Sequence, residues 1–226
     1  MYWDSTIIIL IPAIIFSIVA QIMVKSAFSE YSKVRNSRGL TGADAAREIL
    51  DRNGLTNVRI EHISGSLTDH YDPKANVIRL SDDVYGSATV AAVGVAAHEA
   101  GHAVQYAEGY YPIKIRNAII PVTRFGSSLS TPLVILGLVL SLDFLITAGI
   151  LLFCAVVLFQ AITLPVEFNA SGRALKTLRS SHFLEDDEMK GARSVLTAAA
   201  MTYVAAMLSA LLSLVRLLVI SGRRRR

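Results

Sequence analysis

Four long apolar runs constrain the fold of this 226-residue chain more than any other feature of its sequence. They cover residues 6–24, 125–142, 144–164 and 195–220, and each approaches the roughly 20 residues that a helix needs to cross a bilayer core. Backbone groups inside a bilayer must be paired within the protein, so such runs are expected to be helices. Hydrophobic residues make up 53% of the chain and charged residues 18%, a balance that also favours a membrane protein.

The first run is predicted to be an uncleaved membrane anchor rather than a signal peptide. No basic segment precedes it, and Asp4 stands there instead. Its end at residues 17–20 lacks a small residue three positions before a possible cleavage point.

Residues 25–117 form the only long polar stretch, and we expect them to fold into a small sheet packed on a helix. Thr41 followed by Asp44 resembles an N-cap with an acid in the first helical turn, while Gly54 and Gly109 are typical helix stops. The predicted elements are a helix over 42–53, a strand over 57–63, a turn-rich segment over 67–76, a strand over 77–81 and a helix over 87–108.

The last of these helices carries the motif His98-Glu99-x-x-His102. Residues four apart lie on one face of a helix, so the two histidines can bind one metal ion, and two neutral imidazoles suit zinc. Glu99 lies about 100° further round the helix, where it can reach a water activated by the metal without being a ligand. This is the spacing that zinc-dependent peptide hydrolysis requires. The plainer interpretation, two half-exposed histidines on an ordinary helix, leaves three polar groups in an Ala- and Val-rich run without partners.

Gly101 lies inside the motif, where glycine costs up to about 1 kcal/mol of helix propensity relative to alanine. Such a cost is easier to explain if another element packs closely there. We therefore expect a close contact at Gly101.

A catalytic zinc site usually has three protein ligands and a water, so the two histidines need a further partner. Candidates are His62, His70, His182 and the acidic residues. We prefer Glu167, which follows the third apolar run and should lie at the membrane edge on the same side as the motif helix. An ordinary exposed acid in the first turn of a helix is the alternative. The single cysteine, Cys154, excludes a disulfide framework and a cysteine-ligated metal site.

The motif is preceded by Asp69-His70-Tyr71-Asp72-Pro73 and Leu80-Ser81, and followed by Leu164-Pro-Val-Glu167-Phe168. Together these segments resemble the YugP-like bacterial neutral zinc metallopeptidases, over about residues 39–200. More distantly, Glu167-Phe-x-Ala170 is similar to the Glu-Phe-x-Ala-Asp segment of HtpX-like and prenyl-protein membrane proteases, in which the Glu is the third zinc ligand. The resemblance implies an integral membrane zinc endopeptidase.

The chain departs from that wider pattern at Ser171, where the HtpX-like proteases carry aspartate. A serine is not expected to orient a ligand imidazole as a carboxylate does.

His70 and Tyr71 are candidates to donate hydrogen bonds to the oxyanion that forms when water attacks a peptide carbonyl. Equally, the neighbouring Asp69, Asp72 and Pro73 are typical of a turn in which His70 is satisfied locally.

The predicted fold class is α+β: an integral membrane bundle of about four helices with a small zincin-like, gluzincin-like soluble domain that carries the motif helix. Its predicted parts are an N-terminal anchor over 1–24, a catalytic domain over 25–118, a transmembrane hairpin over 119–165, a polar segment with the third zinc ligand over 166–194, and a C-terminal helix with a basic tail over 195–226.

The predicted activity is that of a zinc-dependent endopeptidase with Glu99 as general base and then as proton donor to the leaving amine. Residues 77–81 are expected to form an edge strand that aligns an extended substrate. The alternative is a non-catalytic membrane adaptor or assembly factor with a structural zinc, which would need a closed site of four ligands. A channel or transporter is disfavoured because the apolar runs carry few ionisable residues.

Four spans would place residues 25–117 and 167–193 on one side of the membrane, and the positive-inside rule puts that side in the cytoplasm. The tail Arg223–Arg226 would then lie outside, against the rule, but the basic cluster on the other side is larger. The net charge of +4 comes partly from this tail and therefore says little about nucleic acid. Basic clusters beside apolar spans are instead expected to meet anionic lipid headgroups. The predicted partners are a peptide or membrane-protein substrate and the lipid bilayer.

Overall fold

The computed structural model describes residues 5–224 of the chain. The first four residues of the predicted anchor and the last two arginines of the basic tail lie outside this range. The chain divides into two compact units, each assembled from separate segments. The first unit contains Met1–Ala20, Pro112–Pro165 and Thr202–Arg226, and the second contains Gln21–Tyr111 and Val166–Met201.

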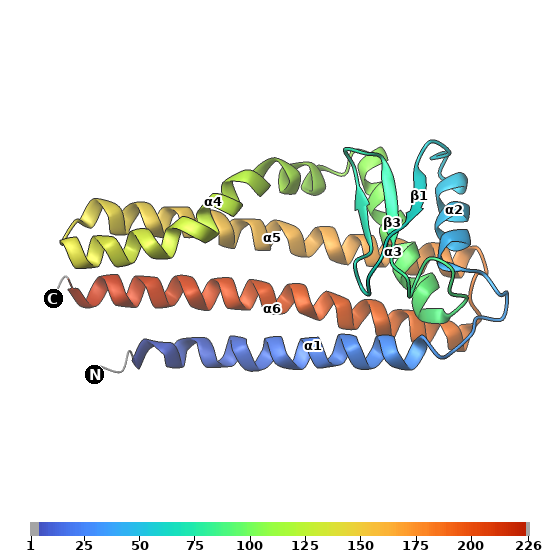
Figure 1. The fold of residues 1–226 in the computed structure, drawn as a ribbon, viewed down its shortest axis with the longest axis horizontal. Helices are drawn as coiled ribbons and strands as arrows, with labels where there is room; N and C mark the ends of the chain where they lie inside the picture. The colour runs from blue at the N-terminus through green and yellow to red at the C-terminus, as the bar shows by residue number, and fades with distance from the viewer. Residues whose placement is uncertain (1–4, 225–226) are drawn as a thin grey trace. The chain divides into compact units, whose positions relative to one another are not determined.

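Apart from a short turn at Ser141 and Leu142, the described part of the first unit is helical (Figure 1). Buried Val134, Ile146 and Leu217 form a small cluster that joins three of its helices. The hydroxyl groups of Ser17 and Ser209 lie 3.4 Å apart and link the first helix to the last. The elements that contribute to this unit are the 3₁₀-helix η1 (Ser5–Leu10) and the helices α1 (Ile11–Tyr31), α4 (Tyr111–Leu140), α5 (Asp143–Ser180) and α6 (Asp186–Arg224).

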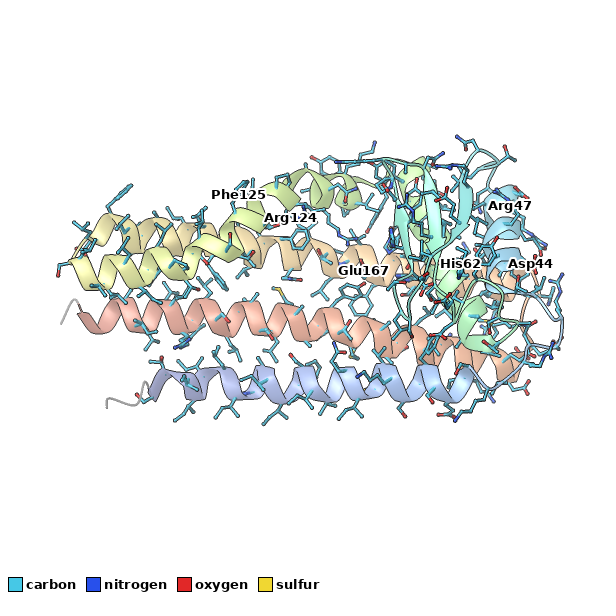
Figure 2. All side chains as sticks on the ribbon, in the orientation of Figure 1. Asp44, Arg47, His62, Arg124, Phe125 and Glu167 are labelled. Carbon is cyan, nitrogen blue, oxygen red and sulfur yellow. The ribbon has the colours of Figure 1, made fainter. Side chains whose placement is uncertain are left out.

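Four helical stretches in the described part of the chain are long and apolar enough to cross a membrane: Ser5–Tyr31, Tyr111–Leu140, Asp143–Ser180 and Asp186–Gly222. Each of the four predicted apolar runs falls on one of them, so the prediction of four such helices is confirmed. Apolar side chains cover the outside of the first unit. Phe125, for example, is 66% exposed, as expected for a side chain that meets lipid (Figure 2).

The helices extend further than the apolar runs predicted. α4 begins fourteen residues before the predicted start at 125. The segment over 167–193, predicted only as polar, is mostly helical: α5 continues to Ser180, and α6 begins at Asp186 after a short turn. In the segment over 167–193, helix continues where the hydropathy signal ends, because apolar side chains such as Leu178 and Ala192 pack in the core of the second unit.

The second unit contains α2 (Gly42–Arg52), α3 (Val90–Ala107) and a three-stranded sheet of order β1-β3-β2. β1 (Arg59–His62) runs parallel to β3 (Val77–Leu80), and β2 (His70–Asp72) runs antiparallel to it. β3 is therefore the central strand, and the prediction that residues 77–81 form an edge strand is wrong. β2, which contacts α3, lies inside the segment predicted only as turn.

Local signals fix both ends of α2. The Thr41 hydroxyl accepts a hydrogen bond from the Asp44 backbone N–H at 3.1 Å, and the Asp44 carboxylate accepts one from the Thr41 N–H, which completes a capping box. Gly54 adopts a φ of 72° just beyond the C-terminus. Arg47 donates to the Val58 carbonyl at 2.7 Å and ties the helix to the chain entering β1 (Figure 2). The predicted helix over 42–53 is confirmed.

α3 is the central helix of the second unit, and most of its residues are buried. Its N-cap is Thr89, whose hydroxyl accepts from the Ala92 backbone N–H at 3.3 Å, and Gly109 with a φ of 70° follows its last turn. Small residues on α3 pack against Leu50 of α2 and Ile78 of β3. The predicted helix over 87–108 is confirmed to within three residues.

Candidate metal centre

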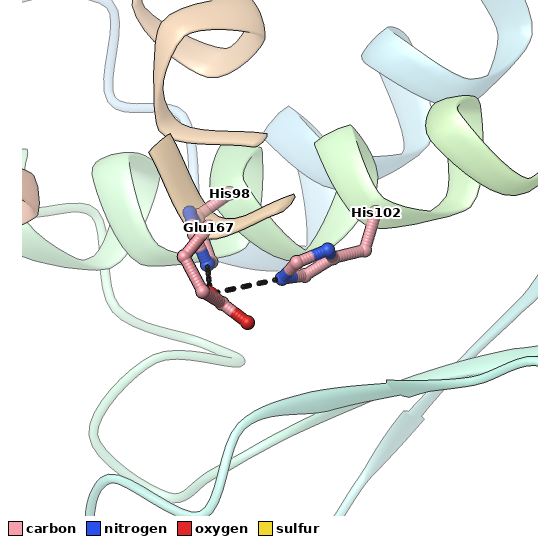
Figure 3. A group of neighbouring side chains, drawn as sticks. All are labelled: His98, His102 and Glu167. Carbon is pink, nitrogen blue, oxygen red and sulfur yellow. Dashed lines mark ion pairs between the residues drawn. The ribbon is translucent and has the colours of Figure 1, made fainter. Parts of the chain in front are cut away.

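Two elements of the second unit bring three metal-binding side chains together (Figure 3). His98 and His102 project from α3, and Glu167 projects from α5. Glu167 Oε2 lies 3.3 Å from His98 Nε2 and 3.4 Å from His102 Nε2. Across the residues that the structure describes, this is the one group of three or more His, Cys, Asp or Glu side chains arranged to hold a metal ion.

The separations suit zinc ligands better than direct hydrogen bonds. Ligand atoms about 2.05 Å from a tetrahedral zinc ion lie roughly 3.3 Å from one another. A hydrogen bond between an imidazole N–H and a carboxylate would be shorter, at about 2.7–2.9 Å. Two imidazole nitrogens and one carboxylate oxygen are also a donor set found in catalytic zinc sites. The residues therefore fit the ion.

Burial and charge at the site also favour a cation. Glu167 is only 2% exposed and lies well inside α5, not in the first turn of a helix. A carboxylate buried in this way is costly unless positive charge compensates it. Burial acts to lower the pKa of His102, but its contact with Glu167 and the charge of Glu99 raise that pKa above its ordinary value. The same negative charge would favour a divalent metal ion between these groups.

Gly101 allows α3 and α5 to approach at the site. A Cβ atom at this position would lie 2.8 Å from the Ala170 carbonyl oxygen, closer than real Cβ contacts come. The close contact predicted from the glycine is confirmed. Because Ala170 is one turn after Glu167 on α5, this approach brings the Glu167 carboxylate within reach of the two histidines.

Both histidine rings are held through the nitrogen that faces away from Glu167. Ser171 Oγ lies 3.1 Å from His98 Nδ1, a contact that we did not expect of a serine. Gln105 Oε1 lies 3.0 Å from His102 Nδ1. The sequence analysis overlooked Gln105, although a glutamine one helical turn after a ligand, within an Ala- and Val-rich helix, was a usable signal.

Glu99, the predicted general base, lies beside this group but does not belong to it. Its side chain is largely buried, and Oε2 accepts a hydrogen bond from the Tyr71 backbone N–H at 2.9 Å. β2 therefore holds one oxygen of the carboxylate.

Tyr71 is half-buried next to the site. Its hydroxyl donates to Asn76 Oδ1 at 3.2 Å, and its ring lies edge-on to the ring of Tyr106, with 6.1 Å between centroids. Burial raises the pKa of the Tyr71 phenol, with further contributions from Tyr106 and Asp72. The hydroxyl therefore keeps its proton and remains a hydrogen-bond donor at neutral pH.

His70 is exposed and held by local contacts. Its Nδ1 lies 2.8 Å from the Thr68 carbonyl oxygen, which can only accept, so Nδ1 carries the proton. Its Nε2 lies 3.4 Å from an Arg79 guanidinium nitrogen, which can only donate. A neutral His70 in this arrangement has no free N–H to offer to a substrate.

The other two candidate histidines lie away from the metal-binding group. His62 on β1 contacts Asp82 Oδ1 through Nε2 at 2.7 Å. His182 lies in the turn between α5 and α6 with a φ of 51°. Neither belongs to the group that could hold a metal.

Comparison with known proteins identifies the family. The model of the family described as "Putative neutral zinc metallopeptidase" matches residues 6–222. The curated "Putative membrane protease YugP" of Bacillus subtilis (strain 168) is 49% identical over 214 residues, which cover 95% of each chain. No solved structure matches the chain. The resemblance seen in the sequence is thus confirmed, and the chain belongs to this family of neutral zinc metallopeptidases.

Proposed function

We propose that this protein is a membrane-embedded, zinc-dependent endopeptidase with a zincin-like catalytic centre. The observation that carries the proposal is a set of three ligands with the Glu99 carboxylate beside it. A structural zinc site is usually closed by four protein ligands, whereas a catalytic site has three and leaves a position open. The three-residue group favours the enzyme over the adaptor with a structural zinc.

His98, His102 and Glu167 would hold the zinc ion. When bound, the ion would polarise a peptide carbonyl and lower the pKa of a water molecule. Glu99 takes a proton from the attacking water and then delivers it to the nitrogen of the leaving amine. The Tyr71 backbone N–H keeps one oxygen of Glu99 fixed, so the other oxygen makes both transfers.

The Tyr71 phenol is proposed as the donor to the oxyanion of the reacting carbonyl. Its hydrogen bond to Asn76 is long at 3.2 Å, so exchanging it for a bond to a developing negative charge costs little. His70 could donate only after taking up a second proton, because Thr68 and Arg79 occupy both ring nitrogens.

An extended peptide substrate would align along β2. A strand edge offers backbone groups to a bound peptide, and β2 is the sheet edge next to α3. The name of the Bacillus subtilis relative, a membrane protease, supports a peptide or membrane-protein substrate. Of the 22 Lys and Arg residues of the chain, 16 lie within 25–117 and 167–193, and this bias supports a cytoplasmic position for those segments.

The proposal is tested with Glu99→Gln in the purified full-length protein. Turnover of casein should fall by roughly 10²- to 10⁴-fold, because the general base is lost. Zinc content should stay at the wild-type level, because Glu99 is not a ligand. Glu48→Gln, at a half-buried position on α2 outside the metal-binding group, is the matched control and should leave both measurements unchanged. Unaltered cleavage by Glu99→Gln would contradict the assignment of Glu99 as the base. Absence of zinc from the wild-type protein would contradict the proposal that it is a zinc-dependent enzyme.

A further inference from the structure

Gln105 is a polar residue with no exposed surface, three positions after His102 on α3. Its amide nitrogen Nε2 lies 2.9 Å from the Val166 carbonyl oxygen and 2.8 Å from Asn169 Oδ1. Its amide oxygen Oε1 lies 3.0 Å from His102 Nδ1. All three contacts lie inside the second unit, and the two made by Nε2 connect α3 to α5.

The direction of each hydrogen bond in this network is set by groups that can only donate or only accept. The Val166 carbonyl can only accept, so the NH₂ group of Gln105 must face it. The Nε–H of Arg173 can only donate, and it lies 2.8 Å from Asn169 Oδ1. Asn169 therefore presents its oxygen both to Arg173 and to Gln105. Arg173 is itself held by Glu108 at 2.6 Å.

These constraints leave Gln105 with only its oxygen to offer to His102. An oxygen accepts, so His102 Nδ1 must carry a proton, and when the ring is neutral its lone pair lies on Nε2. That lone pair is directed towards Glu167 Oε2, 3.4 Å away, and two facing acceptors repel unless a cation lies between them. His98 differs, because the Ser171 hydroxyl at its Nδ1 can either donate or accept.

We propose that Gln105, backed by Asn169 and Arg173, is a positioning residue that fixes the tautomer of His102 so that Nε2 is free to bind zinc. The inference rests on the metal site of the proposed function and not on peptide hydrolysis. Groups that orient a ligand imidazole typically change metal affinity 10- to 100-fold when removed. Gln105→Met keeps the length of the side chain and removes all three hydrogen bonds.

The experiment measures zinc affinity by chelator competition and the tautomer by nitrogen-15 spectra of histidine-labelled, metal-free protein at high pH. Gln105→Met should bind zinc 10- to 100-fold more weakly. The His102 signal should change from a pure Nδ1–H form to a mixture of both tautomers. The His98 signal should stay as in the wild type.

A pair of Asn169 variants tests the direction of the hydrogen bonds in this network. This test does not require that Gln105→Met folds. Asn169→Asp keeps an oxygen that accepts from Gln105 and Arg173, so its zinc affinity should stay within about threefold of wild type. Asn169→Leu has no such oxygen, and its zinc affinity should fall about tenfold. Equal losses in the two Asn169 variants, or a wild-type tautomer and affinity in Gln105→Met, would overturn the proposal. Neither readout requires turnover, so failure of the Glu99 assignment would be seen separately.

Discussion

The contact between Gly101 and Ala170 sets the distance between the two elements that supply the metal ligands. In Gly101→Ala the new Cβ would lie 2.8 Å from the Ala170 carbonyl oxygen, whereas ordinary contacts begin at 3.4 Å. The atom opposite is part of a helix backbone and cannot rotate away. α5 must therefore move from α3 by about 0.6 Å at this point, judged by that contact distance.

The displacement should affect zinc binding more than folding. Glu167 is three residues from Ala170 on the same helix and moves with it, while zinc–ligand distances vary by only about 0.2 Å. We expect zinc affinity to fall 10- to 100-fold, or about 1.4–2.7 kcal/mol. Overpacking costs about 1–3 kcal/mol, but alanine recovers up to about 1 kcal/mol of helix propensity. The free energy of unfolding of the metal-free protein should therefore fall by no more than about 2 kcal/mol.

The assay is chelator competition for zinc, combined with thermal unfolding of the metal-free protein in detergent. Gly94→Ala is the matched control, because it adds the same methyl group on the same helix. Its Cβ would lie 3.5 Å from Ala192 Cβ, which is an ordinary contact, so wild-type zinc affinity is expected. If Gly101→Ala binds zinc within threefold of wild type, the close approach of the helices does not hold the third ligand in place.

Two further sets of variants test single residues of the site. Glu167→Ala should weaken zinc binding by more than the 10- to 100-fold typical when a group that hydrogen-bonds to a ligand is lost. Glu167→Asp should weaken it less, and alanine at Glu185 or Asp187 should leave the metal content normal. Full zinc occupancy in Glu167→Ala would move the third ligand elsewhere. Tyr71→Phe should lower kcat by about 10²-fold without loss of zinc, because one oxyanion donor is removed, and His70→Ala should change kcat by less than about threefold. The opposite ranking of these two variants would assign the oxyanion to His70.

The sequence predicted the parts of the fold that depend on local signals. The apolar runs predicted the four long helices, the Thr41 cap and Gly54 predicted both ends of α2, and Gly109 predicted the end of α3. β2 escaped prediction because it has only three residues, flanked by Asp69 and Pro73, which favour turns. Pairing with β3 and the contact of the Tyr71 backbone with Glu99 on α3 make it a strand, and the second of these partners lies 28 residues away in the sequence. The same interactions make β2 rather than β3 the edge of the sheet.

The metal site was predictable to a similar extent. The spacing of His98 and His102 needs only one helix, so the motif alone placed them on one face. Glu167 could be selected only by its position after an apolar run and by resemblance. The contact of Ser171 with the His98 ring depends on how α3 and α5 pack, which no local pattern encodes. The contact of Gln105 with His102 lies within one turn of α3, so the sequence carried a local signal for it that was overlooked.

The bond between the Tyr71 backbone and Glu99 has a consequence for mutational studies of this family. The donor is a main-chain N–H, which every amino acid except proline supplies. Residue 71 can therefore change its side chain freely without releasing the carboxylate. Alanine at position 71, which deletes a side chain only, would leave this contact intact. Its contribution to holding the base would become visible only through a substitution that removes the amide hydrogen or shifts the path of the strand.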